Sequence, residues 1–183
     1  MEINVLSNLR KNSYQVFSCS VFTVRCDNYF IAKANSIHDF FIIEPTNWVN
    51  AVAITDNQEV ILVKQYRYGI ETITLEIPGG MIDKEELPEI AAQRELLEET
   101  GYKAKNWQLI GITDPNPAIQ NNKCYIFLAT GLEFTTNPKL DNTEEIEIVT
   151  VPLNKIPEMI QQGKITHSLV ITAFYYYNLL KEK

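Results

Sequence analysis

Apolar and polar positions divide the chain into short runs separated by polar breaks. Over residues 14–43, β-branched and aromatic residues dominate, and polar breaks fall at Asp27-Asn28 and Asn35-Ser36. Short runs of this composition between turn-forming residues are typical of β-strands. We therefore predict two to four antiparallel strands, closed by Pro45, because the residue before a proline favours an extended conformation.

The next runs are more continuously apolar and predict a buried sheet. The expected strands are Val49–Thr55, Glu59–Gln65, Thr72–Ile77, Trp107–Thr113, Tyr125–Thr130 and Ile146–Pro152. A turn at Asp56-Asn57 joins the first two as a hairpin. Pro78-Gly79-Gly80 is expected to break the third sharply.

Three segments have the features of helices. A helix is predicted over Pro88–Thr100, because proline suits the first turn and Gly101 suits the position after the last. Asn154 is expected to cap a short helix, Ile156–Gln162, that stops at a glycine. Ser168–Leu180 is expected to form an apolar helix.

Composition describes a globular protein with an acidic surface. The 183 residues are 45% hydrophobic and 21% charged, with a net charge of -7, which is enough for one domain with a sizeable core. The acidic balance argues against non-specific nucleic-acid binding. It still permits an anionic substrate that is bridged by metal ions.

Cysteine usage and hydropathy indicate a compartment. Cys19, Cys26 and Cys124 are an odd number without CxxC spacing, as in proteins whose thiols stay reduced. The first twelve residues lack the apolar core of a signal peptide, and no run has transmembrane length. We expect a cytoplasmic protein that does not bind membranes.

The predicted helix Pro88–Thr100 and its flanks hold more carboxylates than packing requires. Glu95, Glu98 and Glu99 fall on one helix face, where like charges repel by roughly 0.2–0.5 kcal/mol per pair. A divalent cation would offset this repulsion, because hard cations prefer carboxylate oxygens. Ala91 and Ala92 are expected on the same face, leaving room for an ion. The alternative is a solvated acidic helix.

The carboxylates also follow a known pattern. The positions that match the Nudix box G-x5-E-x7-R-E-U-x-E-E-x-G-U are Gly80, Glu86, Arg94, Glu95, Leu96, Glu98, Glu99 and Gly101. Only Tyr102 departs, where the final position is usually aliphatic. The chain therefore resembles the Nudix hydrolases. This resemblance implies an α/β fold: an α/β/α sandwich with a mixed β-sheet in residues 47–183, preceded by a small N-terminal antiparallel sheet in residues 1–46.

The resemblance implies hydrolysis of a pyrophosphate bond with two or three Mg²⁺ or Mn²⁺ ions. The expected metal ligands are the Gly79 carbonyl, Glu95, Glu98 and Glu99, with Glu98 either a ligand or a close neighbour of the ions. Arg94 is expected to hold Glu86 in a bidentate salt bridge that orients the ligands. The general base is expected on a later loop, at Glu144 or Glu145.

A second resemblance concerns the substrate. Gln65-Tyr66-Arg67, the segment from Glu76 to Gly80, and Pro117 are similar to the pattern of ADP-ribose pyrophosphatases and nucleotide-sugar hydrolases. It implies that Arg67 contacts a phosphate and that Glu76 holds the pocket or the ribose. Trp48 or Tyr68 would stack on a base, although core packing is an equal alternative for Trp48.

The predicted reaction releases a nucleoside monophosphate and a sugar phosphate from ADP-ribose or a related nucleotide sugar. The alternatives are a Nudix hydrolase of dinucleoside polyphosphates or nucleoside triphosphates, and a non-catalytic nucleotide-sensing domain. The N-terminal strands are expected to serve in dimerisation or as a substrate lid, which predicts a homodimer. His167 either caps a helix or faces the pocket.

Overall fold

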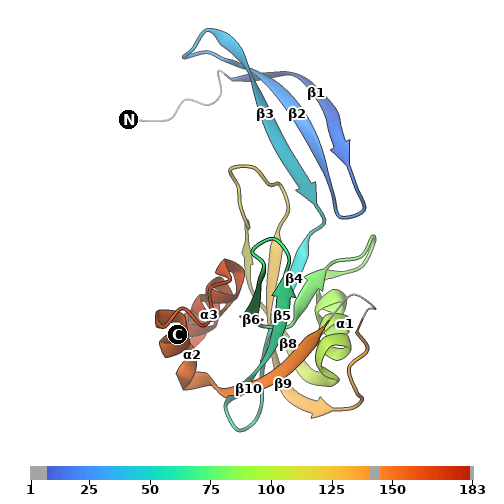
Figure 1. Ribbon diagram of the computed structural model, residues 1–183, viewed down its shortest axis with the longest axis vertical. Coiled ribbons are helices and arrows are strands. Elements are labelled where there is room, and N and C mark those ends of the chain that lie inside the picture. The colour runs from blue at the N-terminus through green and yellow to red at the C-terminus, as the bar shows by residue number, and fades with distance from the viewer. Residues whose placement is uncertain (1–7, 141–144, 182–183) are drawn as a thin grey trace. The chain divides into compact units, whose positions relative to one another are not determined.

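The computed structural model describes residues 8–140 and 145–181, and it contains two compact units (Figure 1). The first unit comprises the chain up to Thr46 together with Asp114–Asn122. The second comprises Asn47–Thr113 and the chain from Lys123 onward.

The first unit is built on a three-stranded antiparallel sheet, in the order β1-β2-β3. Its strands are β1 (Leu9–Ser18), β2 (Phe22–Ile31) and β3 (Ser36–Pro45). The small N-terminal antiparallel sheet is therefore confirmed, and the turn at Asn35, where φ is 52°, falls as predicted.

The break predicted at Asp27-Asn28 is wrong, because β2 continues through both residues. Asp27 is only 2% exposed, and its carboxylate accepts hydrogen bonds from Ser13 Oγ at 2.6 Å and Arg25 Nε at 3.1 Å. Burial opposes ionisation of Asp27, but these donors outweigh it and lower its pKa. A polar residue with such partners is compatible with a central strand.

The segment Asp114–Asn122 attaches to the end of β3 in this unit. The Ile43 N–H donates to the Ile119 carbonyl at 2.8 Å, and Asn121 Nδ2 donates to Glu44 Oε1 at 2.9 Å. These contacts hold the loop that contains Pro117 against the three-stranded sheet.

The second unit contains a mixed sheet of seven strands in its described part. They are β4 (Trp48–Ile54), β5 (Glu59–Arg67), β6 (Thr72–Glu76), β7 (Gly79–Met81), β8 (Tyr102–Thr113), β9 (Cys124–Phe134) and β10 (Ile146–Pro152). The order is β10-β5-β4-β9-β8, with β6 on β5 and β7 on β4. Strands β4 and β9 run parallel and the other pairs antiparallel.

Helices cover both faces of this sheet (Figure 1). They are α1 (Pro88–Thr100) on one face, and α2 (Ile156–Gln161) and α3 (Ser168–Lys181) on the other. The period-two alternation of β4 explains the two layers. Val52 and Ile54 pack in the cluster that includes Phe174 of α3, whereas Val49 and Ala53 pack on the α1 side. The α/β/α sandwich is therefore confirmed.

Helix α1 packs differently from the expectation. Ala91 and Ala92 are completely buried against Val49 and Phe127 instead of lying beside an ion site. Their small side chains let the helix backbone approach the sheet closely, which brings the flanking carboxylates next to β7.

Two smaller predictions also need correction. The chain does break after β6, which ends at Glu76, but Gly79 and Gly80 already belong to β7, which pairs with β4. Asn154 does not cap α2, because it lies inside a 3₁₀ turn, Leu153–Lys155, and α2 starts without a side-chain cap. Within the described ranges, no helix combines the length and apolarity needed to cross a bilayer.

Candidate active site

Helix α1 has the ends that its sequence predicted. Pro88 lies at the first turn, and Gly101 takes a left-handed conformation with φ 74°, from which its N–H donates to the Leu97 carbonyl at 2.8 Å. A left-handed terminal residue favours glycine because a Cβ is strained there. These two ends fix the extent of the helix that carries the carboxylates.

A cavity of about 360 Å³ lies beside this helix in the second unit. Its lining is mostly polar and comes from β4, β5, β7, α1 and the segments near them. The lining residues are Trp48, Gln65, Arg67, Gly79, Gly80, Met81, Asp83, Arg94, Glu95, Glu98, Glu99 and Lys139. The cavity therefore brings together the four expected metal-binding positions with Arg94, Arg67 and Trp48.

Two of the carboxylates are seated against β7. Glu99 is 5% exposed, and its Oε2 accepts the Gly79 N–H at 3.1 Å. Glu95 lies so close to Gly80 that a Cβ at position 80 would collide with the Glu95 carboxylate. A larger residue at position 80 would therefore displace the end of the Glu95 side chain from its present place.

Arg94 is the centre of a cluster of carboxylates. Its Nε and Nη2 donate to the two Glu86 oxygens, both at 3.0 Å, so the predicted bidentate pair is present. Its Nη1 also donates to Glu95 Oε1 at 2.8 Å and Glu98 Oε2 at 3.1 Å, and Nη2 donates to the Met81 carbonyl at 3.0 Å. The contact with Glu86 is the main reason that the pKa of Arg94 is raised and that of Glu86 lowered.

The donor chemistry of the cavity fits a hard divalent cation, because its carboxylates are the ligands that Mg²⁺ and Mn²⁺ prefer. Glu95 and Glu98 already converge on one positive group, Arg94 Nη1. Within residues 8–140 and 145–181, however, no three carboxylate, imidazole or thiol groups are gathered closely enough to hold an ion. In this arrangement Glu95 and Glu98 are paired with Arg94 rather than gathered around an ion position.

A second arginine cluster lies at the ends of β5 and β6. Arg67 Nε and Nη2 donate to Glu76 Oε1 and Oε2 at 2.8 and 2.7 Å, and Thr74 Oγ1 donates to Glu76 Oε1 at 2.5 Å. Burial of Glu76, which is 3% exposed, opposes its ionisation, but Arg67, His167 and Thr74 outweigh this effect and hold its pKa well below the usual range.

His167 joins this cluster just before α3. Its Nδ1 lies 3.1 Å from Glu76 Oε2, an ion-pair distance without regular hydrogen-bond geometry. Its carbonyl accepts the N–H groups of Val170 and Ile171 in the first turn of α3. His167 therefore meets the start of α3 through its backbone carbonyl, whereas its ring lies against the buried Glu76 carboxylate and is not among the groups lining the cavity.

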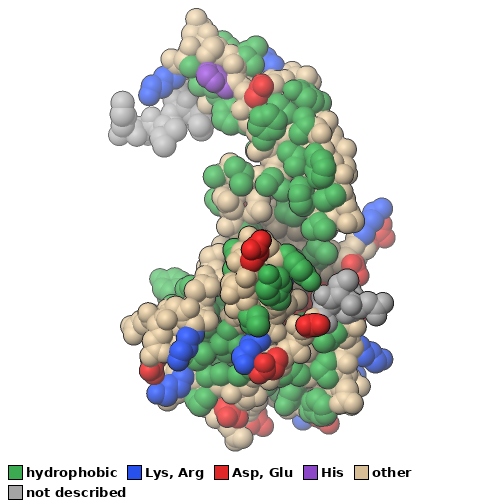
Figure 2. All heavy atoms as spheres, viewed as in Figure 1, with side chains coloured by type: hydrophobic (Ala, Val, Ile, Leu, Met, Phe, Trp, Pro, Cys, Tyr) green, Lys and Arg blue, Asp and Glu red, His purple; other side chains and the backbone are tan. Residues whose placement is uncertain are grey.

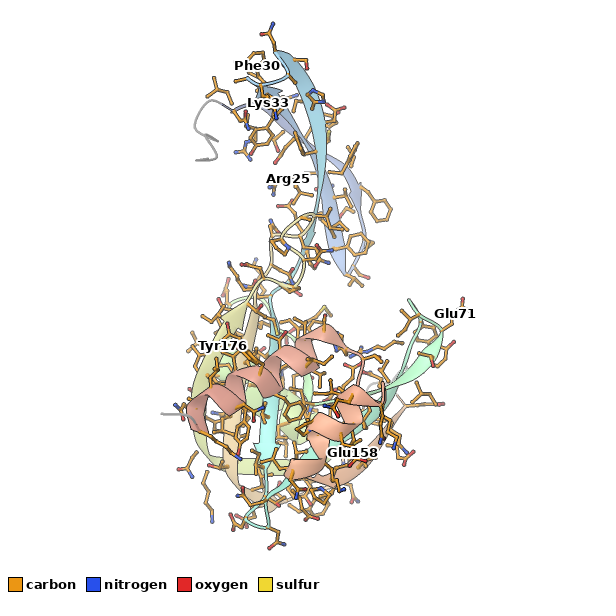
Figure 3. The ribbon with its side chains drawn as sticks, turned by 90° about the vertical axis from the view of Figure 1, so that its left-hand side faces the viewer. Arg25, Phe30, Lys33, Glu71, Glu158 and Tyr176 are labelled. Carbon is orange, nitrogen blue, oxygen red and sulfur yellow. The ribbon has the colours of Figure 1, made fainter. Side chains whose placement is uncertain are left out.

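The candidate base-stacking residues differ in position. Trp48 lines the cavity, and its Nε1 donates to Asn50 Oδ1 at 3.2 Å. Tyr68 is 78% exposed, outside the cavity lining, with its ring edge-on to Tyr66. It belongs to the β5–β6 hairpin, whose projecting tip carries Glu71 (Figure 3).

Two other predicted residues, Pro117 and Glu145, are not among those lining the cavity. Pro117 belongs to the first unit. Glu145 is exposed immediately before β10, and Glu144 lies outside the described residues. The choice between the two glutamates as general base stays open.

Lys139 and Gln65 line the cavity although neither was expected to bind there. Gln65 adjoins the Arg67 motif, which was a signal for it. Lys139 had no local signal, because it reaches α1 only through a tertiary contact: its N–H donates to the Glu98 carbonyl at 2.8 Å.

Comparison with known proteins decides the family. The NUDIX domain matches residues 45–172, which contain both arginine clusters. The chain belongs to the Nudix family. This Nudix protein is 28% identical to the methanol dehydrogenase activator of Bacillus methanolicus, over 90% of this chain and 89% of the relative. It is 32% identical to the ADP-ribose pyrophosphatase of Bacillus subtilis (strain 168), over 75% of each chain.

The fold of this Nudix protein has a solved counterpart. The crystal structure of an ADP compounds hydrolase superimposes with a TM-score of 0.85 at 21% identity, covering 99% of this chain and 97% of the other. The similarity includes the N-terminal sheet because nearly all of both chains is covered. The expected Nudix-type architecture is thereby confirmed, and the chain is a Nudix hydrolase.

Proposed function

We propose that this Nudix hydrolase cleaves the pyrophosphate bond of ADP-ribose or a related nucleotide sugar, in a reaction that depends on Mg²⁺ or Mn²⁺. The products would be a nucleoside monophosphate and a sugar phosphate. The observation that carries the proposal is the single cavity that joins the box carboxylates to Arg67 and Trp48. The similarity to ADP-ribose pyrophosphatases from Bacillus subtilis and Mycobacterium tuberculosis supports the substrate class.

In this proposal the carboxylates of α1 form the metal site. Glu95, Glu98 and Glu99, with the Gly79 carbonyl, would hold two or three divalent cations. Such cations would neutralise phosphate charge and would help the attacking water to lose its proton. Glu86 holds Arg94 in place, and Arg94 in turn orients Glu95 and Glu98 without contacting the substrate.

The other side of the cavity would bind the nucleotide. Arg67 lines the cavity while Glu76 grips two of its nitrogens, so the guanidinium has a fixed orientation toward a phosphate. Trp48 offers an aromatic face for the base. Either Glu98 or a glutamate on the loop before β10, Glu144 or Glu145, would accept the proton of the attacking water.

A substrate panel with product identification tests the proposal. ADP-ribose with Mg²⁺ should yield AMP and ribose 5-phosphate, and Mn²⁺ should be compared in parallel. Preferential cleavage of dinucleoside polyphosphates or nucleoside triphosphates would overturn the substrate class. Tight nucleotide binding without cleavage under either metal would instead indicate a sensing domain.

The proposed enzyme is a cytoplasmic homodimer that associates through the first unit. Hydrophobic side chains gather over the strands of that unit (Figure 2). Its exposed large apolar residues are Leu9, Tyr14, Val16, Phe17, Val21, Ile37, Phe40, Phe41 and Ile119. A surface of this kind is typical of an interaction site. Sedimentation equilibrium should give twice the chain mass, and a monomer at all concentrations would reject the dimer.

A further inference from the structure

The position of Lys139 is fixed by the C-terminal end of α1. Its own N–H donates to the Glu98 carbonyl at 2.8 Å, and the Thr135 N–H and Oγ1 donate to the Gly101 carbonyl at 2.9 and 3.2 Å. These bonds use carbonyl groups that a helix end leaves without intrahelical partners. The segment that carries Lys139 is therefore attached to the same helix turn that presents Glu98 and Glu99 to the cavity.

The charges that line the cavity give Lys139 a distinct role. The two lining arginines are held by bidentate contacts with Glu76 and Glu86. Across the described ranges, Lys139 forms no ion pair, and its side chain is exposed at the cavity. A lysine ammonium is a flexible point charge that adapts to a phosphate oxygen. The Lys139 ammonium can therefore contact a bound ligand without first breaking an ion pair with a carboxylate.

We propose that Lys139 is a substrate-binding residue whose ammonium group contacts a non-bridging phosphate oxygen of the pyrophosphate. This inference rests on the proposed function, because it takes the cavity as the place where the pyrophosphate binds. The contact offsets part of the repulsion between the substrate and the carboxylates Glu95, Glu98 and Glu99. The contact would also make the choice of substrate depend on the negative charge of its phosphates, in addition to the residues of the Nudix box.

A purely structural role makes a different prediction. Helix α1 has no basic residue in its last turn, so Lys139 would also complement the negative end of the helix dipole. In that case its removal would lower thermal stability and leave substrate affinity unchanged. The two roles are separated by measuring KM, kcat and the melting temperature on the same variants.

The test compares Lys139→Ala and Lys139→Arg with Lys164→Ala. Lys164 is a matched control, because it is also exposed, its N–H donates to a helix carbonyl (Met159, 2.9 Å) and it lies outside the cavity lining. Loss of one charge-assisted contact should raise the KM of Lys139→Ala about tenfold, with kcat and melting temperature nearly unchanged. Lys139→Arg should recover most of the affinity, and Lys164→Ala should match the wild type.

An unchanged KM in Lys139→Ala, or a lowered melting temperature with normal KM, would overturn the inference. A binding measurement separates its failure from failure of the proposed reaction. Inorganic pyrophosphate is titrated calorimetrically into wild type and Lys139→Ala in Ca²⁺. Weaker binding to the variant supports Lys139 even when no substrate of the panel is cleaved. Equal affinities, or no binding to the wild type, count against it.

Discussion

The two arginine clusters of the cavity make the same bidentate contact with a glutamate in different surroundings. Glu76 has a side-chain exposure of 4% and is held by Arg67, Thr74 and His167. Around Arg94 the exposure of the carboxylates rises from 13% for Glu86 to 44% for Glu98. The comparison separates a buried anchor from a set of ion pairs that solvent and cations can reach.

Burial decides what each cluster is suited to do. A buried ion pair is costly to break, because the remaining charge is left without its partner in a medium of low dielectric constant. A more exposed pair exchanges partners at lower cost, because water and ions compensate each charge. The Arg67 cluster therefore suits the fixed geometry of a binding pocket, and the Arg94 cluster suits the metal-binding role that we propose for its carboxylates.

The largest expected effect lies in the Arg94 cluster and concerns catalysis. Glu99→Gln and Glu98→Gln should each reduce kcat by about 1000-fold while the fold survives, because each removes a carboxylate charge from the metal site. Steady-state assays and circular dichroism test this. Glu89→Gln is the control, since Glu89 lies in the first turn of α1 outside the cavity lining. Full activity of both variants would refute the assigned metal face.

Removing Glu76, the buried carboxylate of the Arg67 cluster, should instead reduce the stability of the fold. Glu76→Ala is expected to lower the free energy of unfolding by about 2 kcal/mol, less than for a fully buried pair because Arg67 is partly exposed. Urea denaturation at pH 7 measures it. Glu158→Ala, which removes the exposed pair with Lys155 from α2 (Figure 3), should leave the midpoint unchanged. Equal midpoints for both variants would contradict the anchor.

The anchor should also make stability depend on pH. The pKa of Glu76 is lower in the folded state than the ordinary value of about 4.3 for an unfolded chain. Its contribution is thus fully present above that value and is lost as the pH falls toward the folded pKa. The stability difference between wild type and Glu76→Gln should shrink by at most about 1.4 kcal/mol per pH unit as the pH falls below about 4. If the stability difference between the two proteins grew as the pH fell, the lowered pKa of Glu76 would be contradicted.

A smaller effect is expected from the residue that orients Arg94. Glu86→Gln should lower kcat/KM about tenfold and weaken the response to Mg²⁺, because Arg94 loses its charged bidentate partner and is less well aimed at Glu95. Activity measured over a Mg²⁺ titration tests this. If the dependence of activity on Mg²⁺ were unchanged, Glu86 would have no part in orienting the proposed metal ligands.

The smallest effect is expected outside both clusters. Tyr68→Ala should change KM less than about twofold, because an exposed side chain outside the cavity contributes little. Trp48→Ala, measured beside it, should raise KM more strongly, since Trp48 lines the cavity. If KM rose more in Tyr68→Ala than in Trp48→Ala, Tyr68 would be the residue that stacks on the base.

The helix and its carboxylates were predictable because their determinants are local. Pro88 and Gly101 specify the two ends of α1 from within the helix itself, and the structure has both. The strand break expected at Asp27-Asn28 failed for the opposite reason. Asp27 is compatible with a strand only because Ser13 and Arg25 satisfy its carboxylate, and sequence composition does not reveal such partners.

The cavity itself was only partly predictable. The box motif marked Glu95, Glu98 and Glu99, but helix periodicity alone placed Ala91 and Ala92 beside them, whereas both alanines pack on the sheet. Whether a helix face is buried or exposed depends on which other elements pack against it. That information resides in β4 and β9, not in the helix.

The sequence by itself determined the bounds of α1, because its capping residues lie within or next to the helix. It also determined the spacing of the carboxylates and, through that motif, membership of a hydrolase family. Only the tertiary structure decided which charged residues of different elements meet around the cavity. Pairing of β5 with β6 brings Arg67 to Glu76, the start of α3 adds His167, and a bond to the end of α1 brings Lys139 to the cavity. Sheet register and burial set these distances.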